Sequence, residues 1–266
     1  MTRWARLDAE LVRRGLAASR AQAAELVASG RVRVDGQTAT KPATGVAAAT
    51  ALLVADTNTA PSYASRGGHK LAGALDDFSA KGLTVDGRRC LDAGASTGGF
   101  TDVLLRRGAT EVVAADVGYG QLAWSLQMDP RVRVLDRTNV RTLTPEHTDG
   151  PVDVIVADLS FIALGVVLGA LASCLRPGGD LVPMVKPQFE VGRAGVGRGG
   201  VVRDPQRRAT AVLGVAETAA ALGLGVAGVS RSVLPGPAGN VEFFLWLRVG
   251  APPADPATLT AVTVGG

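Results

Sequence analysis

The sequence predicts an α/β protein whose larger part is a mostly parallel, doubly wound sheet and whose N-terminal part is a small basic domain. From about residue 63, short apolar segments alternate with helix-like segments, as in parallel sheets covered by helices. A turn of small residues at 94–99 follows the first of these apolar segments. Residues 1–41 hold eight Lys/Arg and four Asp/Glu, net +4, which equals the charge of the whole chain (28 − 24 = +4). Residues 42–266 are therefore neutral overall.

Residues 1–58 are expected to form the small domain, followed by a linker at 59–64. A helix is predicted over 8–14 and ends at Gly15. Ser19 and Gln22 have the spacing of a capping box, so a second helix should run to about residue 29, with Gly30 as its C-cap. Residues 31–36 alternate polar and apolar up to an Asp-Gly turn, which is typical of a strand. The side chains expected to form its core are Leu7, Leu11, Leu16, Leu26 and Val27.

The surplus of cations on this small unit is typical of a module that binds the phosphates of RNA or DNA. The alternative is an ordinary solvated charged face. The cations expected outside the core are Arg6, Arg13, Arg14, Arg20, Arg31, Arg33 and Lys41. The candidate contacts to nucleic acid among them are Arg6, Arg14, Arg20 and Lys41.

The larger part should contain seven strands, at 89–93, 111–115, 132–135, 152–157, 180–185, 225–231 and 241–249. Helices are expected at 100–107, 121–128, 161–175 and 205–222. The connection at 234–240 contains two Pro and two Gly and is a turn rather than a helical crossover, so the last two strands can be antiparallel. A parallel sheet with one reversed strand is the class I (Rossmann-like) methyltransferase arrangement, expected over 65–250. The Pro/Ala/Thr-rich residues 251–266 should form a loose tail.

Composition argues against several other classes of protein. The two cysteines, Cys90 and Cys174, lie in apolar runs, which fits buried thiols in the reducing cytoplasm. His69 and His147 are far apart, so no metal site is expected. The N-terminus lacks the apolar core of a signal peptide. Residues 159–175 carry no charge over 17 residues, but a strand end and a packed helix explain this run better than a membrane span.

The turn at 94–99 is the strongest indication of a ligand. Its Gly-x-x-x-Gly-Gly spacing is neither the dinucleotide pattern nor a phosphate loop, which would need Lys where Phe100 stands. With the acid Asp92 beside it, the turn suits S-adenosylmethionine. Asp116 lies 22 residues after Gly94, where an acid typically holds ribose hydroxyls, although it could instead cap a helix. Asn139 could contact an adenine edge.

Other polar residues stand at the expected strand ends, where ligands of such sheets bind. Asp158 and Lys186 end strands that should be neighbours, and Glu242 begins the last strand. A Lys acts as a general base only when neutral, which burial or a second cation such as Lys70 favours. We therefore expect Asp158 and Glu242 to position Lys186, and Lys70 to favour its neutral form.

Six segments resemble the TlyA family of rRNA cytidine 2′-O-methyltransferases, of the FtsJ-like superfamily, whose members are also called haemolysins. They are SRGGHK (65–70), CLDAGASTGGFT (90–101), ADVGYGQL (115–122), ADLSFI (157–162), VKPQFE (185–190) and GPAGNVE (236–242). The N-terminal part resembles the α+β alpha-L RNA-binding domain of the ribosomal protein S-four type. The resemblance covers roughly residues 3–248.

This resemblance implies a catalytic tetrad of Lys70, Asp158, Lys186 and Glu242. The residues expected to hold S-adenosylmethionine are Asp92, Gly94, Ser96, Gly98, Phe100, Asp116 and Asn139. Arg66 would join the RNA contacts, and Phe161 would stack near the target nucleotide. The implied partner is rRNA within the small (16S), the large (23S) or both ribosomal subunits, in the cytoplasm, without metal or membrane. The family also implies a link to susceptibility to capreomycin-type cyclic peptide antibiotics.

Three alternatives remain open. A membrane-active haemolysin would need a span or an amphipathic surface helix. A non-catalytic rRNA-binding assembly factor would not need an intact tetrad. Base methylation usually relies on an Asn/Asp-Pro-Pro-Tyr motif or a nucleophilic Cys, whereas residues 158–161 read DLSF.

Overall fold

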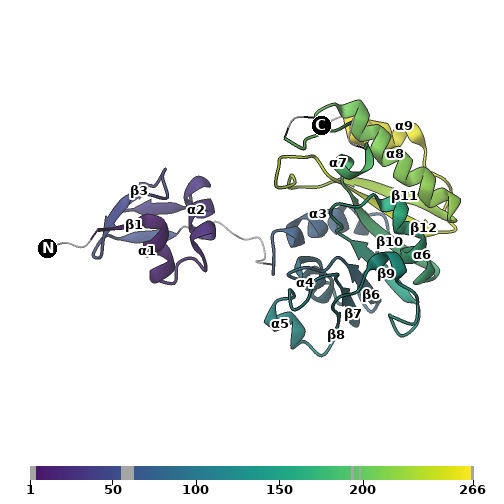
Figure 1. Ribbon diagram of the computed structural model, residues 1–266, viewed down its shortest axis with the longest axis horizontal. Helices are drawn as coiled ribbons and strands as arrows, with labels where there is room; N and C mark the ends of the chain where they lie inside the picture. The colour runs from purple at the N-terminus through teal and green to yellow at the C-terminus, as the bar shows by residue number, and fades with distance from the viewer. Residues whose placement is uncertain (1–3, 55–62, 193–194, 198, 265–266) are drawn as a thin grey trace. The chain divides into compact units, whose positions relative to one another are not determined.

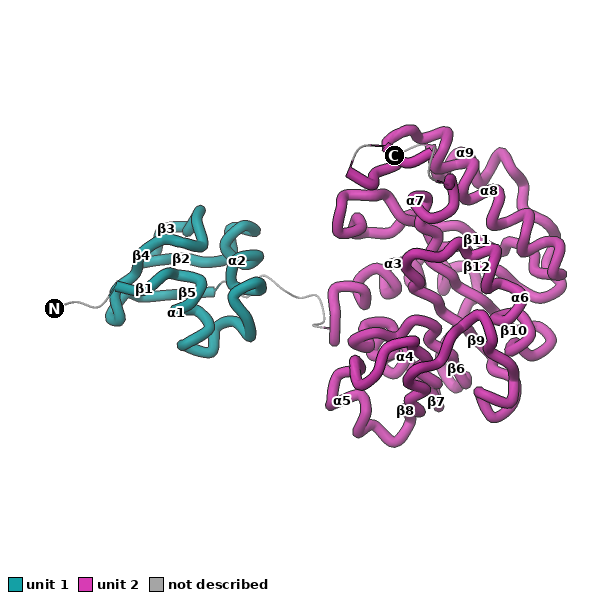
Figure 2. The backbone as a smooth tube through the Cα atoms, viewed as in Figure 1, with its two compact units in different colours: residues 1–61 teal, residues 62–266 magenta. Residues whose placement is uncertain are grey.

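The computed structural model describes residues 4–54, 63–192, 195–197 and 199–264 (Figure 1). The chain divides into two compact units, residues 1–61 (unit 1) and residues 62–266 (unit 2), as Figure 2 shows. Residues 59–62 of the expected linker lie outside the described residues.

Unit 1 is a small α+β domain. Its elements are β1 (Trp4–Arg6), α1 (Leu7–Arg13), α2 (Arg20–Ala28), β2 (Val32–Val34), β3 (Gln37–Thr38), β4 (Gly45–Ala47) and β5 (Leu52–Val54). They form a β1-β4 pair and a three-stranded β3-β2-β5 sheet. Ser19 caps α2 by accepting from the Gln22 amide at 3.2 Å, and the Gln22 side chain accepts from the Ala18 amide rather than from Ser19. The predicted second helix is thus confirmed, but the Gln22 side chain bonds to the amide one residue before the N-cap.

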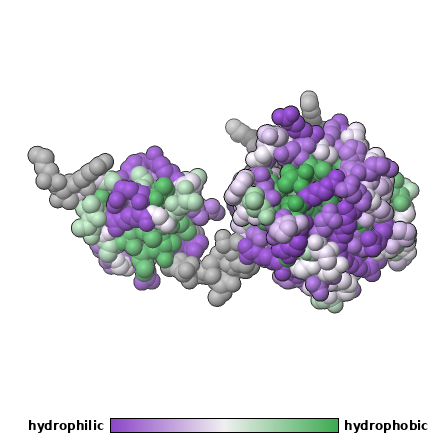
Figure 3. Space-filling view, turned by 90° about the horizontal axis from the view of Figure 1, so that it is seen from below, coloured by the Kyte–Doolittle hydropathy of each residue, from purple (hydrophilic) through white to green (hydrophobic). Residues whose placement is uncertain are grey.

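The core of unit 1 contains four of the five predicted leucine and valine side chains, Leu7, Leu11, Leu26 and Val27. Leu16 is the exception, because the chain turns at Gly15 (φ 72°), just after α1, and the Leu16 side chain lies at the surface. Hydrophobic surface is visible on the face of unit 1 seen in Figure 3. The exposed large hydrophobic residues described in this unit are Trp4, Leu16 and Leu53.

Unit 2 contains a seven-stranded sheet in the order β11-β12-β10-β9-β6-β7-β8. The strands are β6 (Arg89–Ala93), β7 (Glu111–Ala115), β8 (Val132–Leu135), β9 (Val152–Ala157), β10 (Leu175–Val185), β11 (Leu224–Arg231) and β12 (Phe243–Val249). β12 runs antiparallel to both β10 and β11, whereas the other pairings are parallel. The predicted sheet with one reversed strand is therefore confirmed.

Helices cover both faces of this sheet (Figure 1). One core joins the sheet to α3 (Gly67–Ser79), α4 (Gly99–Arg106) and α5 (Trp124–Gln127). The other joins it to α6 (Leu168–Ser173), α8 (Pro205–Ala221) and α9 (Pro256–Val264). The remaining short helices are η1 (Val140–Thr142), η2 (Leu164–Val166) and α7 (Pro187–Glu190). The two apolar faces bury the parallel strands, as their continuous hydrophobic sequences require.

Four predicted elements differ from the structure. The helix expected at 161–175 is a loop, η2 and the short α6, and the one expected at 121–128 shrinks to α5. The expected loose tail contains α9, where Leu259 and Thr263 are buried and Asp255 accepts from the amides of Ala257 and Thr258. β10 begins at Leu175 rather than at 180, so the last residue of the uncharged run 159–175 is the first residue of a strand.

Within the described residues, no helix has both the length and the apolar character needed to cross a bilayer.

Candidate functional site: a crevice at the carboxyl edge of the sheet

The candidate site lies where β6 and β9 end side by side, with their following connections leading to opposite faces of the sheet. Open α/β sheets bind ligands at such a switch point. Gly94 follows β6 with φ of 87°, and a Cβ there would lie 2.6 Å from the carbonyl oxygen of Asp158. Only glycine allows the two strand ends to approach in this way.

All four predicted tetrad residues line one cavity of about 390 Å³. Lys70 comes from the first turn of α3, Asp158 follows β9, and Lys186 follows β10. Glu242 immediately precedes β12, rather than beginning it as expected. Four elements distant in sequence thus bring two cations and two carboxylates together.

The tetrad forms two ion pairs. Lys70 Nζ donates to Glu242 Oε2 at 2.5 Å, and Lys186 Nζ lies 2.6 Å from Asp158 Oδ1. Lys186 Nζ also donates to Ser160 Oγ at 3.0 Å. Glu242 therefore pairs with Lys70 and not, as expected, with Lys186. The two pairs together carry no net charge, which suits a mostly buried group of ions.

The glycine turn and Asp116 border a second cavity, of about 630 Å³. Asp116 Oδ2 accepts from the Ser96 amide at 2.8 Å and Oδ1 from the Gly118 amide at 2.7 Å, so the carboxylate is fixed at the end of β7. Asn139 is exposed here and caps η1 through its side chain. The two cavities share Gly94, Ser96, Asp158 and Ser160, and so form one continuous crevice.

Five of the seven predicted donor-binding residues line this crevice: Gly94, Ser96, Phe100, Asp116 and Asn139. Gly98 and Asp92 do not. Gly98 (φ 94°) is the N-cap of α4, and a Cβ there would overlap Leu126 and Leu122. Gly98 therefore shapes the turn from behind.

Asp92 is completely buried beneath the turn. Its Oδ2 accepts from Thr101 Oγ1 at 2.7 Å, and its Oδ1 has no partner among the described residues. Burial raises the pKa of Asp92 to about 7, the charges of Asp158 and Asp116 add to this rise, and the Thr101 hydrogen bond opposes it. Asp92 thus ties β6 to α4 rather than contacting the crevice.

The predicted RNA contacts of unit 2 both lie at the crevice. Arg66 is exposed and lines the tetrad cavity. Phe161 is 92% exposed, has φ of 63° and lies 5.3 Å from the ring of Phe189. A large aromatic side chain held in the open at a cavity rim is suited to stack on a base.

The predicted RNA contacts of unit 1 differ in how free they are. Arg14 donates to the carbonyl oxygens of Ala47, Ala48 and Thr50 and pairs with Glu10, so it stabilises the fold. Arg6 and Arg20 share Asp8 and are 52% and 60% exposed. Lys41 is exposed as well.

Sequence reasoning missed two residues of the site. Ser160 accepts from Lys186 and lines both cavities, although it lies inside the DLSF segment that pointed to the site. Thr101, fully buried, holds Asp92. A hydroxyl has no sequence signature of its own, so only its neighbours in the motif could have indicated it.

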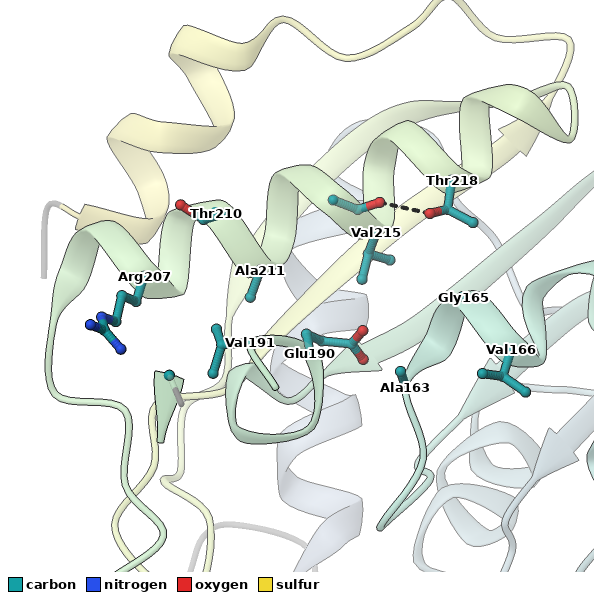
Figure 4. A pocket seen from close by; sticks show the side chains of 12 residues that line it. Ala163, Gly165, Val166, Glu190, Val191, Arg207, Thr210, Ala211, Val215 and Thr218 are labelled. Atoms are coloured by element: carbon teal, nitrogen blue, oxygen red, sulfur yellow. Dashed lines mark hydrogen bonds between the residues drawn. The ribbon is translucent and has the colours of Figure 1, made fainter. Parts of the chain in front are cut away.

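A third cavity, of about 660 Å³, is a groove between α8, α7 and η2 (Figure 4). Glu190 points into it from α7 and accepts from the Leu164 amide at 2.9 Å. Burial raises the pKa of Glu190 above its ordinary value. The groove is lined mostly by small and apolar side chains and contains no member of the tetrad.

Comparison with known proteins agrees with this geometry. The FtsJ-like methyltransferase family matches residues 63–249, and the S4 domain matches residues 5–49. The 16S/23S rRNA (cytidine-2′-O)-methyltransferase TlyA of Mycobacterium tuberculosis is 64% identical over 93% of this chain and 91% of its own. Hemolysin A of Brachyspira hyodysenteriae is 34% identical over 90% of this chain and 97% of its own. The solved structure of a candidate hemolysin from Streptococcus thermophilus has a TM-score of 0.77 and 37% identity, over 100% of this chain and 96% of its own.

Proposed function

Because the chain belongs to the FtsJ-like methyltransferase family, we propose that it transfers a methyl group from S-adenosylmethionine to the 2′-hydroxyl of a cytidine in ribosomal RNA. The observation that carries this proposal is the single cavity that contains the whole tetrad and opens into the crevice beside Asp116. The relative that is 64% identical is named for both 16S and 23S rRNA, so we propose both ribosomal subunits as substrates.

The residues of the crevice fit the methyl donor. The carboxylate of Asp116, already fixed by two amides, has the chemistry to accept hydrogen bonds from ribose hydroxyls. Apolar side chains of Val117, Leu159 and Ile162 line the same cavity and suit the faces of adenine. S-adenosylmethionine supplies a methyl group that is already electrophilic, so positioning contributes much of the rate.

Lys186 is the residue best placed to act on the attacking hydroxyl. Its ammonium donates to Ser160 Oγ, is paired with Asp158 and borders the tetrad cavity, where the attacking hydroxyl would lie. Lys186 first passes a proton to Asp158, whose side chain is 27% exposed, and its neutral amine then accepts the hydroxyl proton as the hydroxyl oxygen takes the methyl group and the methyl–sulfur bond of the donor breaks. The proton then leaves to solvent, and no charge accumulates in the pocket.

The pair of Lys70 and Glu242 acts differently. Its side chains are 9% and 1% exposed, so it holds a fixed dipole in the same cavity as Lys186 and has less access to solvent than the pair of Lys186 and Asp158. We propose that it orients the ribose and the Lys186 ammonium. Phe161 and Arg66 would receive the base and the backbone of a nucleotide drawn out of its helix.

Methyl transfer to separated ribosomal subunits tests this proposal. The purified protein and S-adenosylmethionine labelled in its methyl group are incubated with small subunits, with large subunits and with both. We expect label in the rRNA of each subunit. Binding of rRNA without incorporation of label would instead support a non-catalytic assembly factor.

A further inference from the structure

Arg208 is a buried cation for which the described part of the chain provides no counter-ion. It lies near the start of α8 and is 7% exposed, on the helix face that also carries Val212 and Val215 and packs against the sheet. Its Nε has no hydrogen-bond partner, and none of the described carboxylates forms an ion pair with it. Burying an unpaired guanidinium is strongly unfavourable, so such a group is seldom retained without a use.

A second arginine lies next to it. Arg231 is the last residue of β11 and is exposed, and no described residue pairs with its side chain. Burial, and then the charge of Arg231, lower the pKa of Arg208, and Asp204 opposes this fall. Asp204 is already used, since it accepts from the Gln206 amide as the N-cap of α8 and lies 3.6 Å from Arg207. α8 and β11 pack against each other and are joined by the short turn at 222–223, so the start of α8 lies beside the end of β11, and the two like charges lie close together with only partial compensation.

This arginine pair lies at the same edge of the sheet as the tetrad. Arg231 is opposite Phe243 in the β11–β12 ladder, and the Ser232 amide donates to the Glu242 carbonyl oxygen at 2.9 Å. Asn240 accepts from the Val202 amide at 3.0 Å and so fixes the approach to α8. The segment that carries Glu242 is thus flanked by the tetrad cavity and by the arginine pair.

The chemistry of the pair selects an oxyanion. Guanidinium groups match the oxygens of a phosphate and donate to them in pairs. We propose that Arg208 and Arg231 bind a backbone phosphate of the RNA substrate close to the reactive nucleotide. The identity of the anion as RNA rests on the proposed function, whereas the anion site itself does not.

The neighbouring residue Arg207 differs from Arg208 in its position: it lines the groove of Figure 4 and is not part of the arginine pair. Lys81 is a charge-matched control: it is exposed and lies beyond the end of α3 opposite to Lys70.

Thermal unfolding tests the anion site independently of RNA. In phosphate-free buffer, Arg208→Met should leave Tm unchanged or raise it, because it removes an unpaired buried charge. Inorganic phosphate should raise the Tm of the wild type and of Lys81→Met by about 3 °C, and should raise it much less in Arg208→Met and Arg231→Met. A fall in the Tm of Arg208→Met by several degrees without phosphate, or equal phosphate effects in all four proteins, would overturn the site.

RNA binding tests the assignment to the substrate. Arg208→Met and Arg231→Met should each weaken rRNA binding about tenfold and lower the salt slope of log K by about one, with S-adenosylmethionine affinity unchanged. Lys81→Met should bind rRNA as the wild type does. If the two arginine variants lose the rise in Tm with phosphate but bind rRNA as tightly as the wild type, the site binds another oxyanion and the RNA assignment is wrong. If the protein methylates no rRNA while both arginine effects persist, the proposed function fails and the phosphate site stands.

Discussion

The two lysine–carboxylate pairs of the tetrad have the same chemistry but different access to solvent. Lys70 and Glu242 are 9% and 1% exposed, whereas Lys186 and Asp158 are 10% and 27% exposed. Lys186 also has a third partner, Ser160, at the junction of the two cavities. An enclosed pair can fix an electric field but exchanges protons slowly with water, while an open pair can take a proton and release it. On this difference we propose proton transfer for the open pair (Lys186 and Asp158) and positioning for the enclosed pair (Lys70 and Glu242).

Removing Lys186 should give the largest effect. Lys186→Ala is expected to slow methyl transfer by about 1,000-fold or more, because the attacking hydroxyl loses both its proton acceptor and its hydrogen bond. Single-turnover incorporation of labelled methyl into rRNA measures this. Affinity for S-adenosylmethionine, measured by calorimetry, is the control and should stay within a factor of about three of the wild type. Transfer at the wild-type rate would remove Lys186 from the chemistry.

Breaking the enclosed pair should mainly cost stability. Glu242→Gln leaves Lys70 buried without a carboxylate and should lower the free energy of unfolding by about 3–5 kcal/mol. Asp158→Asn, in the open pair, should cost less, about 1–2 kcal/mol, because Asp158 is partly exposed and Lys186 keeps its hydrogen bond to Ser160. Urea unfolding compares the two variants. Equal losses would show that the difference in exposure has no energetic consequence.

The double variant Lys70→Met/Glu242→Leu separates stability from positioning. It should recover most of the stability lost in Glu242→Gln, because no buried charge remains unpaired. Methyl transfer should stay well below the wild-type rate in this variant. Recovery of transfer together with stability would show that the enclosed pair has only a structural role.

Asp92 extends the comparison to a carboxylate with no cation at all. Its pKa is about 7 in the folded protein and should be near the ordinary 3.8 in the unfolded chain. The folded state therefore holds an extra proton between these values, and stability falls as pH rises through this window. Asp92→Asn does not titrate and so lacks this loss of stability at higher pH. The free energy of unfolding of Asp92→Asn relative to that of the wild type should therefore increase by about 2–3 kcal/mol from about pH 5 to pH 8. Urea unfolding at both pH values measures this. A difference in unfolding free energy between the variant and the wild type that stayed constant with pH would contradict it.

The smallest effects are expected in unit 1. There the comparison is between Arg14, which is bonded within the fold, and Arg20, which is mostly exposed. Arg20→Met should weaken rRNA binding about two- to fivefold and reduce its salt dependence, since Arg20 is 60% exposed. Arg14→Met should instead lower the stability of unit 1 and speed its hydrogen exchange, because three carbonyl oxygens lose their donor. Both are measured on the full chain, by filter binding and by hydrogen exchange of unit 1. The reverse pattern would assign Arg14 to RNA and Arg20 to the fold.

Much of the fold could be predicted because strand signals are local. The strands at 89–93, 111–115, 132–135 and 152–157 have the bounds expected from their apolar runs and flanking turns. The run 159–175 was misread because a buried loop, a short helix and a strand end can all be uncharged. Its first residues instead form the loop that holds Phe161 in the open, which periodicity does not indicate.

The members of the site were predictable and their pairing was not. Strand-end positions and motif resemblance pointed to all four tetrad residues. That Lys70 pairs with Glu242, 172 residues away, depends on how α3 and the segment before β12 meet, and spacing carries no information about that. Asp92 shows the same limit, since its place beneath the turn follows from its contact with Thr101.

The central claim is that the protein methylates a ribose 2′-hydroxyl of rRNA and that the open pair of the tetrad removes the proton of that hydroxyl. The most direct measurement is the chemical position of the label after incubation of ribosomal subunits with labelled S-adenosylmethionine. We expect a cytidine ribose whose 3′ phosphodiester resists alkaline cleavage, since only a free 2′-hydroxyl permits that cleavage, and no label with Lys186→Ala. Label on a base, or equal labelling by Lys186→Ala, would contradict the claim.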